Sequence, residues 1–170
     1  KYGANLKTDI KKDKVFEKII TLDKNTIVIL VDGLGFYKVK DLNESSVLKR
    51  GLKASLQTVN PTSTACVLTS LVSASYPSEH GIFGWWQYSK KHDINYYPLL
   101  FSDKKGINLK EKNINANEIF KIKSIFDKLD INSDIYMNRK LINSDYSKIF
   151  NSEKSNKYGT YSIRDAFNKI

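Results

Sequence analysis

The stretch from Val59 to Trp86 constrains the fold of this chain more than any other segment. It leads through Asn60-Pro61 into Thr64 to Ala74, a run of small and apolar residues. This run predicts a helix that packs closely on a sheet. Three hydroxyl residues stand at the predicted helix start: Thr62, Ser63 and Thr64. One hydroxyl is enough to cap a helix, and a helix N-terminus stabilises negative charge. We therefore interpret this cluster as a place for chemistry on an anion.

A second apolar run precedes this stretch. Thr26 to Val31 is mostly β-branched and has no polar alternation, which is typical of a central parallel strand buried on both faces. The run ends in Asp32-Gly33, and ligand sites of open α/β sheets lie beyond the carboxyl ends of their strands. Asp32 is therefore a candidate ligand-binding residue, although Asp-Gly is equally common in turns. Leu52 to Val59 is a weaker strand candidate.

The remaining segments predict further helices and strands. Helices are expected within Lys1 to Lys24, over Asp41 to Arg50, over Glu118 to Leu129 and from Tyr161 onward. A β-hairpin is expected over Trp86 to Phe101, with His92 near its tip, and another strand over Ile131 to Met137. Loops are expected over Asp103 to Asn115 and over Asn143 to Tyr158, where the chain is polar.

The composition argues against several classes of protein. The formal net charge is +10, but lysine far outnumbers arginine and travels with asparagine and isoleucine throughout, which indicates a biased background rather than a nucleic-acid surface. The longest purely apolar run, Ile27 to Val31, is too short to cross a bilayer, so no membrane span is expected. Cys66 is the single cysteine, so no internal disulfide forms, and we interpret it as a small core residue.

The segment after the predicted helix carries a histidine and an aromatic cluster. His80 lies in a turn from Tyr76 to Gly81 and could bind metal, act as a base or tie down the turn; we favour the structural role, because no second ligand stands at metal-site spacing. Trp85 and Trp86 either pack in the core or form a wall against which a substrate ring stacks.

Two of these features together resemble a known family. Val31-Asp32-Gly33, followed by P-T-S-T-A-C-V-L-T-S-L-V-S-A-S-Y-P-S-E-H-G-I, resembles the N-terminal part of type I phosphodiesterase/nucleotide pyrophosphatase proteins of the alkaline phosphatase superfamily. The resemblance implies an α/β fold, a three-layer sandwich with a mainly parallel central sheet. Residues 1–170 would be a single, incomplete domain, the N-terminal portion of that sandwich.

The resemblance also implies roles for single residues. Thr64 would be the nucleophile and a metal ligand, Asp32 would hold a metal, and Trp85 and Trp86 would line the substrate pocket. The cofactors would be two divalent ions, zinc or alternatively manganese. The substrate would be a small phosphodiester or phosphomonoester of the nucleotide-like kind, hydrolysed through the threonine.

The chain departs from the family pattern in three ways. Ala65, Val67 and Leu68 stand where family members often have Phe, Asn and His, and Trp85 replaces an Asn that contacts the phosphoryl oxygen. A nucleotide preference is therefore not implied. The family's remaining Asp and His ligands lie in its C-terminal half, whereas the two histidines here, His80 and His92, both come too early. We expect the 170 residues to need that C-terminal half and to be inactive, or nearly so, without it.

Two other functions remain open from the sequence. The first is a non-catalytic phosphate-binding or scaffold domain with the same fold. The second, which we rank below both the enzyme and the scaffold, is a basic nucleic-acid-binding domain.

Overall fold

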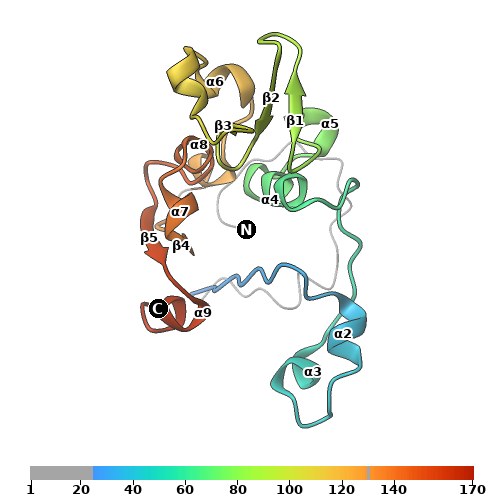
Figure 1. Cartoon of the computed structure of the whole chain (residues 1–170). Coiled ribbons are helices and arrows are strands. Elements are labelled where there is room, and N and C mark those ends of the chain that lie inside the picture. Colours follow the sequence, from blue (N-terminus) through green and yellow to red (C-terminus); the bar gives the residue numbers. More distant parts are fainter. Residues whose placement is uncertain (1–24, 130) are drawn as a thin grey trace. The chain divides into compact units, whose positions relative to one another are not determined.

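The structure, a computed structural model, describes residues 25–129 and 131–170. These residues divide into two compact units, 25–57 and 58–170, of which each is described by itself. The helix expected within Lys1 to Lys24 lies outside the described residues. Figure 1 labels the elements of both units along the chain.

The first unit holds two short helices, α2 (Phe36–Lys40) and α3 (Val47–Gly51). The sequence predicts one helix over Asp41 to Arg50, but Asp41 is the C-cap of α2 and the turn between the helices is held by Asn43. The Asn43 side-chain oxygen accepts hydrogen bonds from the backbone N–H and the hydroxyl of Ser45, at 2.9 and 2.8 Å. Such side-chain bonds compete with helix formation, so the helix begins only at Val47.

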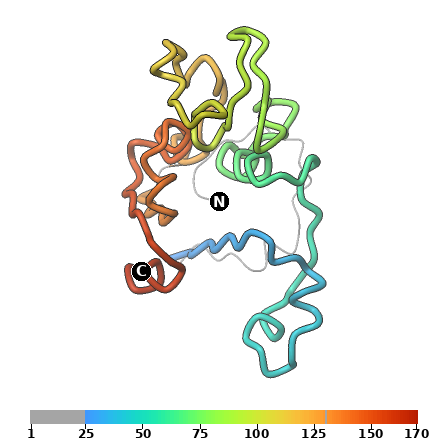
Figure 2. Tube along the Cα trace, viewed as in Figure 1, coloured from blue at the N-terminus to red at the C-terminus, as the bar shows by residue number. Residues whose placement is uncertain are grey.

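The run from Thr26 to Val31 belongs to neither sheet of the described structure, which corrects the buried strand predicted from the sequence. Its trace is extended (Figure 2), and its side chains face solvent, with Val28 77% exposed. The weaker strand candidate, Leu52 to Val59, is not a strand either. Both errors have one reason: strand preference is realised only when a partner strand lies alongside, and the local sequence does not specify that partner.

The second unit is organised around α4 (Thr64–Ser73), whose bounds match the predicted helix to within one residue. Its buried face consists of small side chains: Ala65, Cys66, Thr69 and Ser73. The two hydroxyls on this face donate to the carbonyl four residues earlier, Thr69 to Ala65 and Ser73 to Thr69, each at 2.6 Å. Because these polar groups are satisfied within the helix, the face packs against the core without an unpaired donor.

The core that covers this face is rich in aromatic rings. Phe120 lies at its centre, with ring centroids 5.8 Å from Phe101, 5.5 Å from Tyr146 and 5.6 Å from Phe150. The contacts with Tyr146 and Phe150 are edge-on, the geometry that aromatic quadrupoles favour. The hydroxyl of Tyr146 bonds to Thr69 of α4 at 2.9 Å, which fastens the helix to the core.

Short helices and an antiparallel sheet surround α4. Pro77 to His80 forms α5 (Pro77–His80), where the sequence predicts a turn. The expected hairpin is confirmed as β1 (Gln87–Ser89) and β2 (Ile94–Tyr97), and β3 (Ser102–Asp103) extends it to three strands in the order β1-β2-β3. In its register Gln87 lies opposite Tyr96 and Ser89 opposite Ile94. The loop that follows contains the 3₁₀ turn η1 (Leu109–Lys112).

A parallel pair of strands makes the fold α/β. It consists of β4 (Asp134–Asn138), close to the predicted strand, and β5 (Asn156–Thr160). The crossover between them carries α7 (Arg139–Ile142) and α8 (Asp145–Phe150). The loop predicted over Asn143 to Tyr158 is therefore wrong, because polar residues form a capped helix and a partly exposed strand here. A mainly parallel central sheet is not shown, since the three-stranded sheet is antiparallel.

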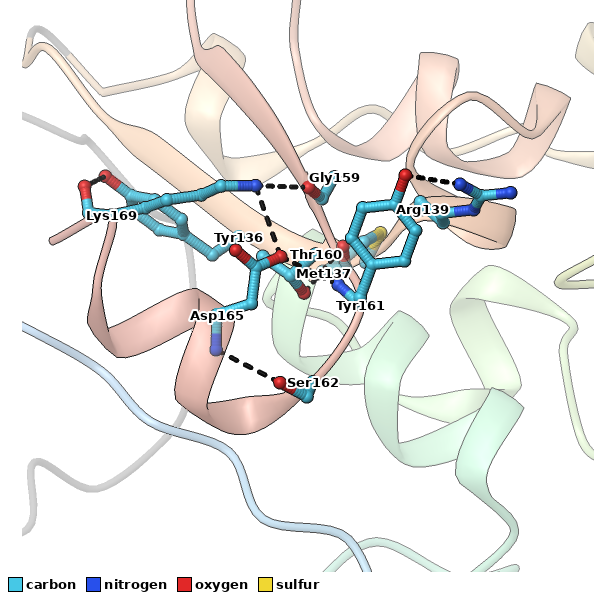
Figure 3. A network of polar contacts seen from close by, with 9 residues as sticks. All are labelled: Tyr136, Met137, Arg139, Gly159, Thr160, Tyr161, Ser162, Asp165 and Lys169. Carbon is cyan, nitrogen blue, oxygen red and sulfur yellow. Dashed lines mark hydrogen bonds and ion pairs between the residues drawn. The ribbon is translucent and has the colours of Figure 1, made fainter.

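The last helix, α9 (Ile163–Phe167), is tied to the end of β5 by a network of polar contacts (Figure 3). The Lys169 ammonium donates to the carbonyl of Gly159 at 2.9 Å and lies 3.3 Å from the Asp165 carboxylate. That carboxylate also accepts from the backbone N–H of Tyr161, at 2.9 Å. The Arg139 guanidinium stands over the Tyr161 ring, 4.5 Å from its centroid. The helix start expected from Tyr161 onward is thus confirmed.

The helix predicted over Glu118 to Leu129 is wrong. The structure has α6 (Ala116–Ile119), an extended Phe120 and the 3₁₀ turn η2 (Ile125–Asp127) in its place. Across residues 25–129 and 131–170 no helix is both long and apolar enough to span a membrane.

Candidate functional site

Thr64 is the first residue of α4, and its neighbour Ser63 is the cap of that helix. The Ser63 hydroxyl oxygen accepts from the backbone N–H of Cys66 at 3.4 Å and donates to the carbonyl of Phe83 at 3.1 Å. Ser63 is therefore the residue that caps the helix. Thr62 is exposed, whereas Thr64 is partly buried. The N-terminal turn of a ten-residue helix presents N–H groups and a positive dipole end to any anion at this place.

The turn after α4 is fastened back onto the helix through His80, which is 5% exposed. The backbone N–H of Ile82 donates to Nδ1 of His80 at 3.0 Å, so this nitrogen is unprotonated. The proton then sits on Nε2, which lies 2.8 Å from the Ser70 hydroxyl and donates to it. Burial lowers the pKa of His80, and the smaller effect of the Glu79 carboxylate opposes this. These contacts agree with the structural role favoured from the sequence.

Trp85 and Trp86 are exposed, at 47% and 39%, so they are not core residues. Both contact the ring of Tyr97 on β2. The Trp86 centroid lies 4.4 Å from that of Tyr97 with the planes tilted by 54°, and the Trp85 centroid lies 6.4 Å away in an edge arrangement. The structure therefore brings the two tryptophans together around a third ring that sequence reasoning missed. The hairpin register carried the signal: pairing Gln87 with Tyr96 sets Trp86 opposite Tyr97.

The loop that carries the tryptophans is braced by Gln87, a second residue not found from the sequence. Its side-chain oxygen accepts from the N–H of Phe83 and its side-chain nitrogen donates to the carbonyl of Gly81, both at 2.9 Å. Gly84 lies where a side chain would not fit easily, because an added Cβ would stand 3.2 Å from the carbonyl oxygen of Trp86. The loop is thus held at both ends of a tight bend.

Asp32 belongs to the first unit and Thr64 to the second, so their pairing in one site stays a prediction. Gly33, which follows Asp32, has a φ of +74° and turns the chain in a conformation that glycine adopts readily.

The residues that the structure describes contain no group of three or more His, Cys, Asp or Glu side chains able to hold a metal ion. Asp32 and Thr64 alone supply too few ligands for a pair of metal ions. The described residues therefore do not fit a complete dinuclear centre.

Other polar residues with altered pKa values belong to the scaffold. Burial alone would raise the pKa of Asp145, but hydrogen bonds from Lys110 and Asn108 and the charges of Lys110 and Lys148 hold it below the usual value. Burial raises the pKa of the Cys66 thiol, which is fully enclosed and agrees with the core role expected for it.

Comparison with known proteins places the chain in a class and then in a family. A model described as type I phosphodiesterase / nucleotide pyrophosphatase matches residues 26–145 of the 170, a span that includes Asp32, Thr64, Trp85 and Trp86. The class is that of phosphodiesterase- and pyrophosphatase-type hydrolases, whose members are generally metal-dependent and act on phosphate esters. Because the match covers well over half of its length, the chain belongs to the type I phosphodiesterase/nucleotide pyrophosphatase family. Neither a comparison with curated proteins nor one with solved structures gives a match.

Proposed function

We propose that this chain carries part of the active site of an enzyme that hydrolyses phosphodiesters or phosphomonoesters, with Thr64 as the nucleophile. The observation that carries the proposal is the family match over residues 26–145, within which Thr64 is the first residue of a helix capped by its neighbour Ser63. A hydroxyl at this position meets a phosphoryl group where the helix stabilises negative charge.

The proposed reaction has two displacements at phosphorus. The Thr64 oxygen attacks, a bond from this oxygen to phosphorus forms, and the bond from phosphorus to the leaving-group oxygen breaks. The hydroxyl proton of Thr64 passes to solvent, and the leaving group departs as an alcohol after taking a proton from solvent. Water then attacks the phosphorus of the threonine adduct, which restores the threonine and releases phosphate from a monoester substrate or a phosphomonoester from a diester substrate. Negative charge on the phosphoryl oxygens grows beside the first turn of α4, where its N–H groups favour it.

Family membership makes metal dependence the general expectation, and we propose Asp32 and Thr64 as two of the ligands of a zinc or manganese pair. The finer fold is likewise a proposal: a single domain that forms the N-terminal part of a three-layer sandwich with a mainly parallel central sheet. Completion of the site by a C-terminal half, and inactivity of the 170 residues without it, stay predictions from the sequence.

The substrate side of the site is proposed to lie at Trp85 and Trp86. What supports it is their exposure together with the hydrogen bond from Ser63 to Phe83, which links their loop to the start of α4. A small phosphate ester with an organic substituent would place its phosphate at the start of α4 and its substituent at the two tryptophans.

Hydrolysis of bis-p-nitrophenyl phosphate and p-nitrophenyl phosphate by the full-length protein, with zinc or manganese supplied, tests the proposal. Thr64→Ala should lower the rate by about a thousandfold or more, because it removes the attacking atom. Thr62→Ala is the matched control, since it deletes the exposed hydroxyl two residues away and should leave the rate nearly unchanged. Asp32→Ala should also abolish most activity. If Thr64→Ala and Asp32→Ala leave the hydrolysis rate unchanged, the assignment of these two residues to the active site is wrong.

A covalent intermediate gives an independent readout. Acid quenching during turnover, followed by mass spectrometry, should find a phosphoryl adduct on the peptide that contains Thr64. The same peptide of the Thr64→Ala variant should carry no adduct. Phosphate binding without turnover would instead favour the non-catalytic scaffold. Sequence-independent DNA binding that falls steeply with salt would favour the nucleic-acid alternative.

A further inference from the structure

The second unit contains a pocket of about 540 Å³ that none of the residues proposed for catalysis or substrate binding lines. Its walls come from the hairpin of β1 and β2 and from α6, which Figure 1 shows next to each other. Tyr88 and Ile119 supply apolar surface to the wall. The Tyr88 hydroxyl donates to Asp93 at 2.7 Å, so this acid of the hairpin turn is already occupied. A pocket of this volume has the size of a site for a small organic molecule.

The wall of the pocket carries an excess of positive charge. Three lysines line it: Lys90, Lys91 and Lys121. The lining contains one acid, Glu118, so two positive charges are left over. Within residues 25–129 and 131–170, neither Lys90 nor Lys121 forms an ion pair. Ammonium groups that share one concave surface repel one another, and an anion bound among them removes that repulsion.

Lys91 is the lysine of the three that has a partner, because its ammonium donates to Oε2 of Glu118. This hydrogen bond holds the pKa of Glu118 below its usual value, so the carboxylate is charged at neutral pH. Nε2 of His92 lies 3.7 Å from the same oxygen. This nitrogen is buried and makes no hydrogen bond within the part of the chain that the structure describes. Lys91 can therefore turn to a bound anion while Glu118 keeps a neighbour able to donate to it.

We propose that this pocket binds a small organic phosphate as a dianion, with the phosphate among the three lysine ammonium groups and the organic part against Tyr88 and Ile119. A phosphomonoester carries close to two negative charges and three acceptor oxygens, which matches the charge excess and the number of lysines. Lysine binds phosphate as a point charge. The inference does not rest on the proposed function, since the pocket has no residue in common with that site.

Calorimetric titration of the protein with two probes of equal shape tests the charge requirement. Butylphosphonate has a carbon–phosphorus bond that ester hydrolysis cannot break, and it is a dianion at about pH 9, where lysine stays protonated. Butanesulfonate has the same chain and one negative charge. We expect butylphosphonate to bind with a Kd on the order of 1 mM and about fivefold more tightly than butanesulfonate. Inorganic phosphate, which lacks the butyl group, should bind about threefold more weakly than butylphosphonate.

Charge-removing variants locate the binding site. Lys90→Gln and Lys121→Gln should each weaken butylphosphonate binding by about fivefold, because each removes one ammonium group from the pocket. Lys90→Arg retains the charge and should retain most of the affinity. Lys154→Gln is the matched control: it removes the same charge at an exposed lysine between α8 and β5, outside the pocket, and should leave the affinity unchanged.

Glu118→Gln should act in the opposite direction. It removes the negative charge from the pocket and frees Lys91, so it should tighten butylphosphonate binding by about fivefold. Glutamine can still accept the hydrogen bond that Glu118 receives from the backbone N–H of Asn115, at 3.3 Å, so α6 keeps its cap. Damage to the fold does not tighten binding, so this variant separates the electrostatic effect from a structural one.

Several results would overturn the inference. They are no binding of butylphosphonate, equal binding of the two probes, unchanged affinity in Lys90→Gln and Lys121→Gln, or weaker binding in Glu118→Gln. Binding that is lost in Thr64→Ala and kept in Lys90→Gln would place the phosphonate at the start of α4 instead. Displacement of butylphosphonate by an oligonucleotide without a terminal phosphate, through the same lysines, would assign the pocket to a nucleic-acid surface and also contradict the inference.

Discussion

At the scale of single residues, His80 shows how one buried ring fastens a turn. Its Nδ1 accepts the N–H of Ile82, a residue that is itself buried, and its Nε2 donates to Ser70 on α4. A proton added at Nδ1 would face the Ile82 N–H, so that two donors would point at each other. Protonation therefore breaks the bond to Ile82, and this conflict, together with burial, is why the charged form is disfavoured in the folded protein.

The lowered pKa of His80 predicts a dependence of stability on pH. In the unfolded chain the imidazole titrates near its ordinary value of 6.5, whereas in the folded chain it stays neutral to lower pH. Between these two pKa values the unfolded state binds more protons, so the free energy of unfolding falls as the pH falls. Above pH 6.5 this contribution is complete. Urea unfolding followed from pH 8 downward measures the slope.

His80→Gln is the variant that tests this assignment. It should cost about 1–3 kcal/mol at pH 8, because one or both hydrogen bonds are lost, and it should remove the slope just below pH 6.5. The losses of stability due to buried carboxylates such as Asp145 come at lower pH and remain in the variant, because their pKa values lie below 3.8. A slope that persists in His80→Gln would assign it to another group.

At the scale of elements, the start of α4 depends on one side chain. Ser63 accepts from the N–H of Cys66 and donates to the carbonyl of Phe83, so it links the helix to the loop that carries Trp85 and Trp86. Ser63→Ala should lower the free energy of unfolding by about 1–2 kcal/mol. Ser63→Thr keeps the hydroxyl and should recover most of the loss. Denaturant unfolding of the three proteins measures the effect, and a cost of Ser63→Ala near zero would mean that the 3.4 Å cap bond contributes little.

The bounds of α4 were predictable because local signals set them. Pro61 interrupts the preceding run, Ser63 caps the first turn, and Ala74 closes the helix in the left-handed conformation, with a φ of 50°. The position of Thr64 at the helix start follows from these neighbours alone, whereas its role as nucleophile is implied by the family resemblance. The pairing of Thr64 with Asp32 does not, because it depends on contacts between segments thirty residues apart.

The helix expected over Glu118 to Leu129 does not form, because contacts with residues far along the chain favour another conformation. Its apolar spacing is helical, but Phe120 is extended (φ −99°, ψ 100°) and its ring lies at the centre of the aromatic core. Ser124 caps η2 and donates to the carbonyl of Phe150 at 2.6 Å. Core packing and this buried hydrogen bond outweigh a weak local preference. Tyr97 was missed for another reason: its ring partners, Trp85 and Trp86, lie just before β1 and meet it only through the hairpin register.

At the scale of the whole molecule, burial is confined to one of the two units. The hydrophobic core runs from Ala65 to Phe150 in the second unit. In the first unit no residue between 25 and 57 is buried. The run from Ile27 to Val31 is exposed throughout, although its composition is that of a core strand. Contiguous apolar surface of this kind commonly marks a place where another segment packs. The proposed three-layer sandwich would bury this run as a central strand.

Val28→Asp separates the exposed state from the proposed buried one. In the 170-residue chain, where Val28 is 77% exposed, the substitution should change the free energy of unfolding by less than about 0.5 kcal/mol. In a longer chain that completes the sandwich, it would bury an unpaired carboxylate in the sheet and should cost more than about 4 kcal/mol. Val47→Asp, at a valine of similar exposure on α3, is the control and should have little effect in either chain.

The urea midpoints of the two chains test two separate predictions. A large cost of Val28→Asp in the 170-residue chain would contradict the exposure of residues 27–31. A small cost in the longer chain would remove the central strand from the proposed sandwich, and with it the reason to place Asp32 at the carboxyl end of that strand. A small cost in the first and a large one in the second would support burial of this run when the sandwich is complete, which is the arrangement that the proposed partnership of Asp32 and Thr64 requires.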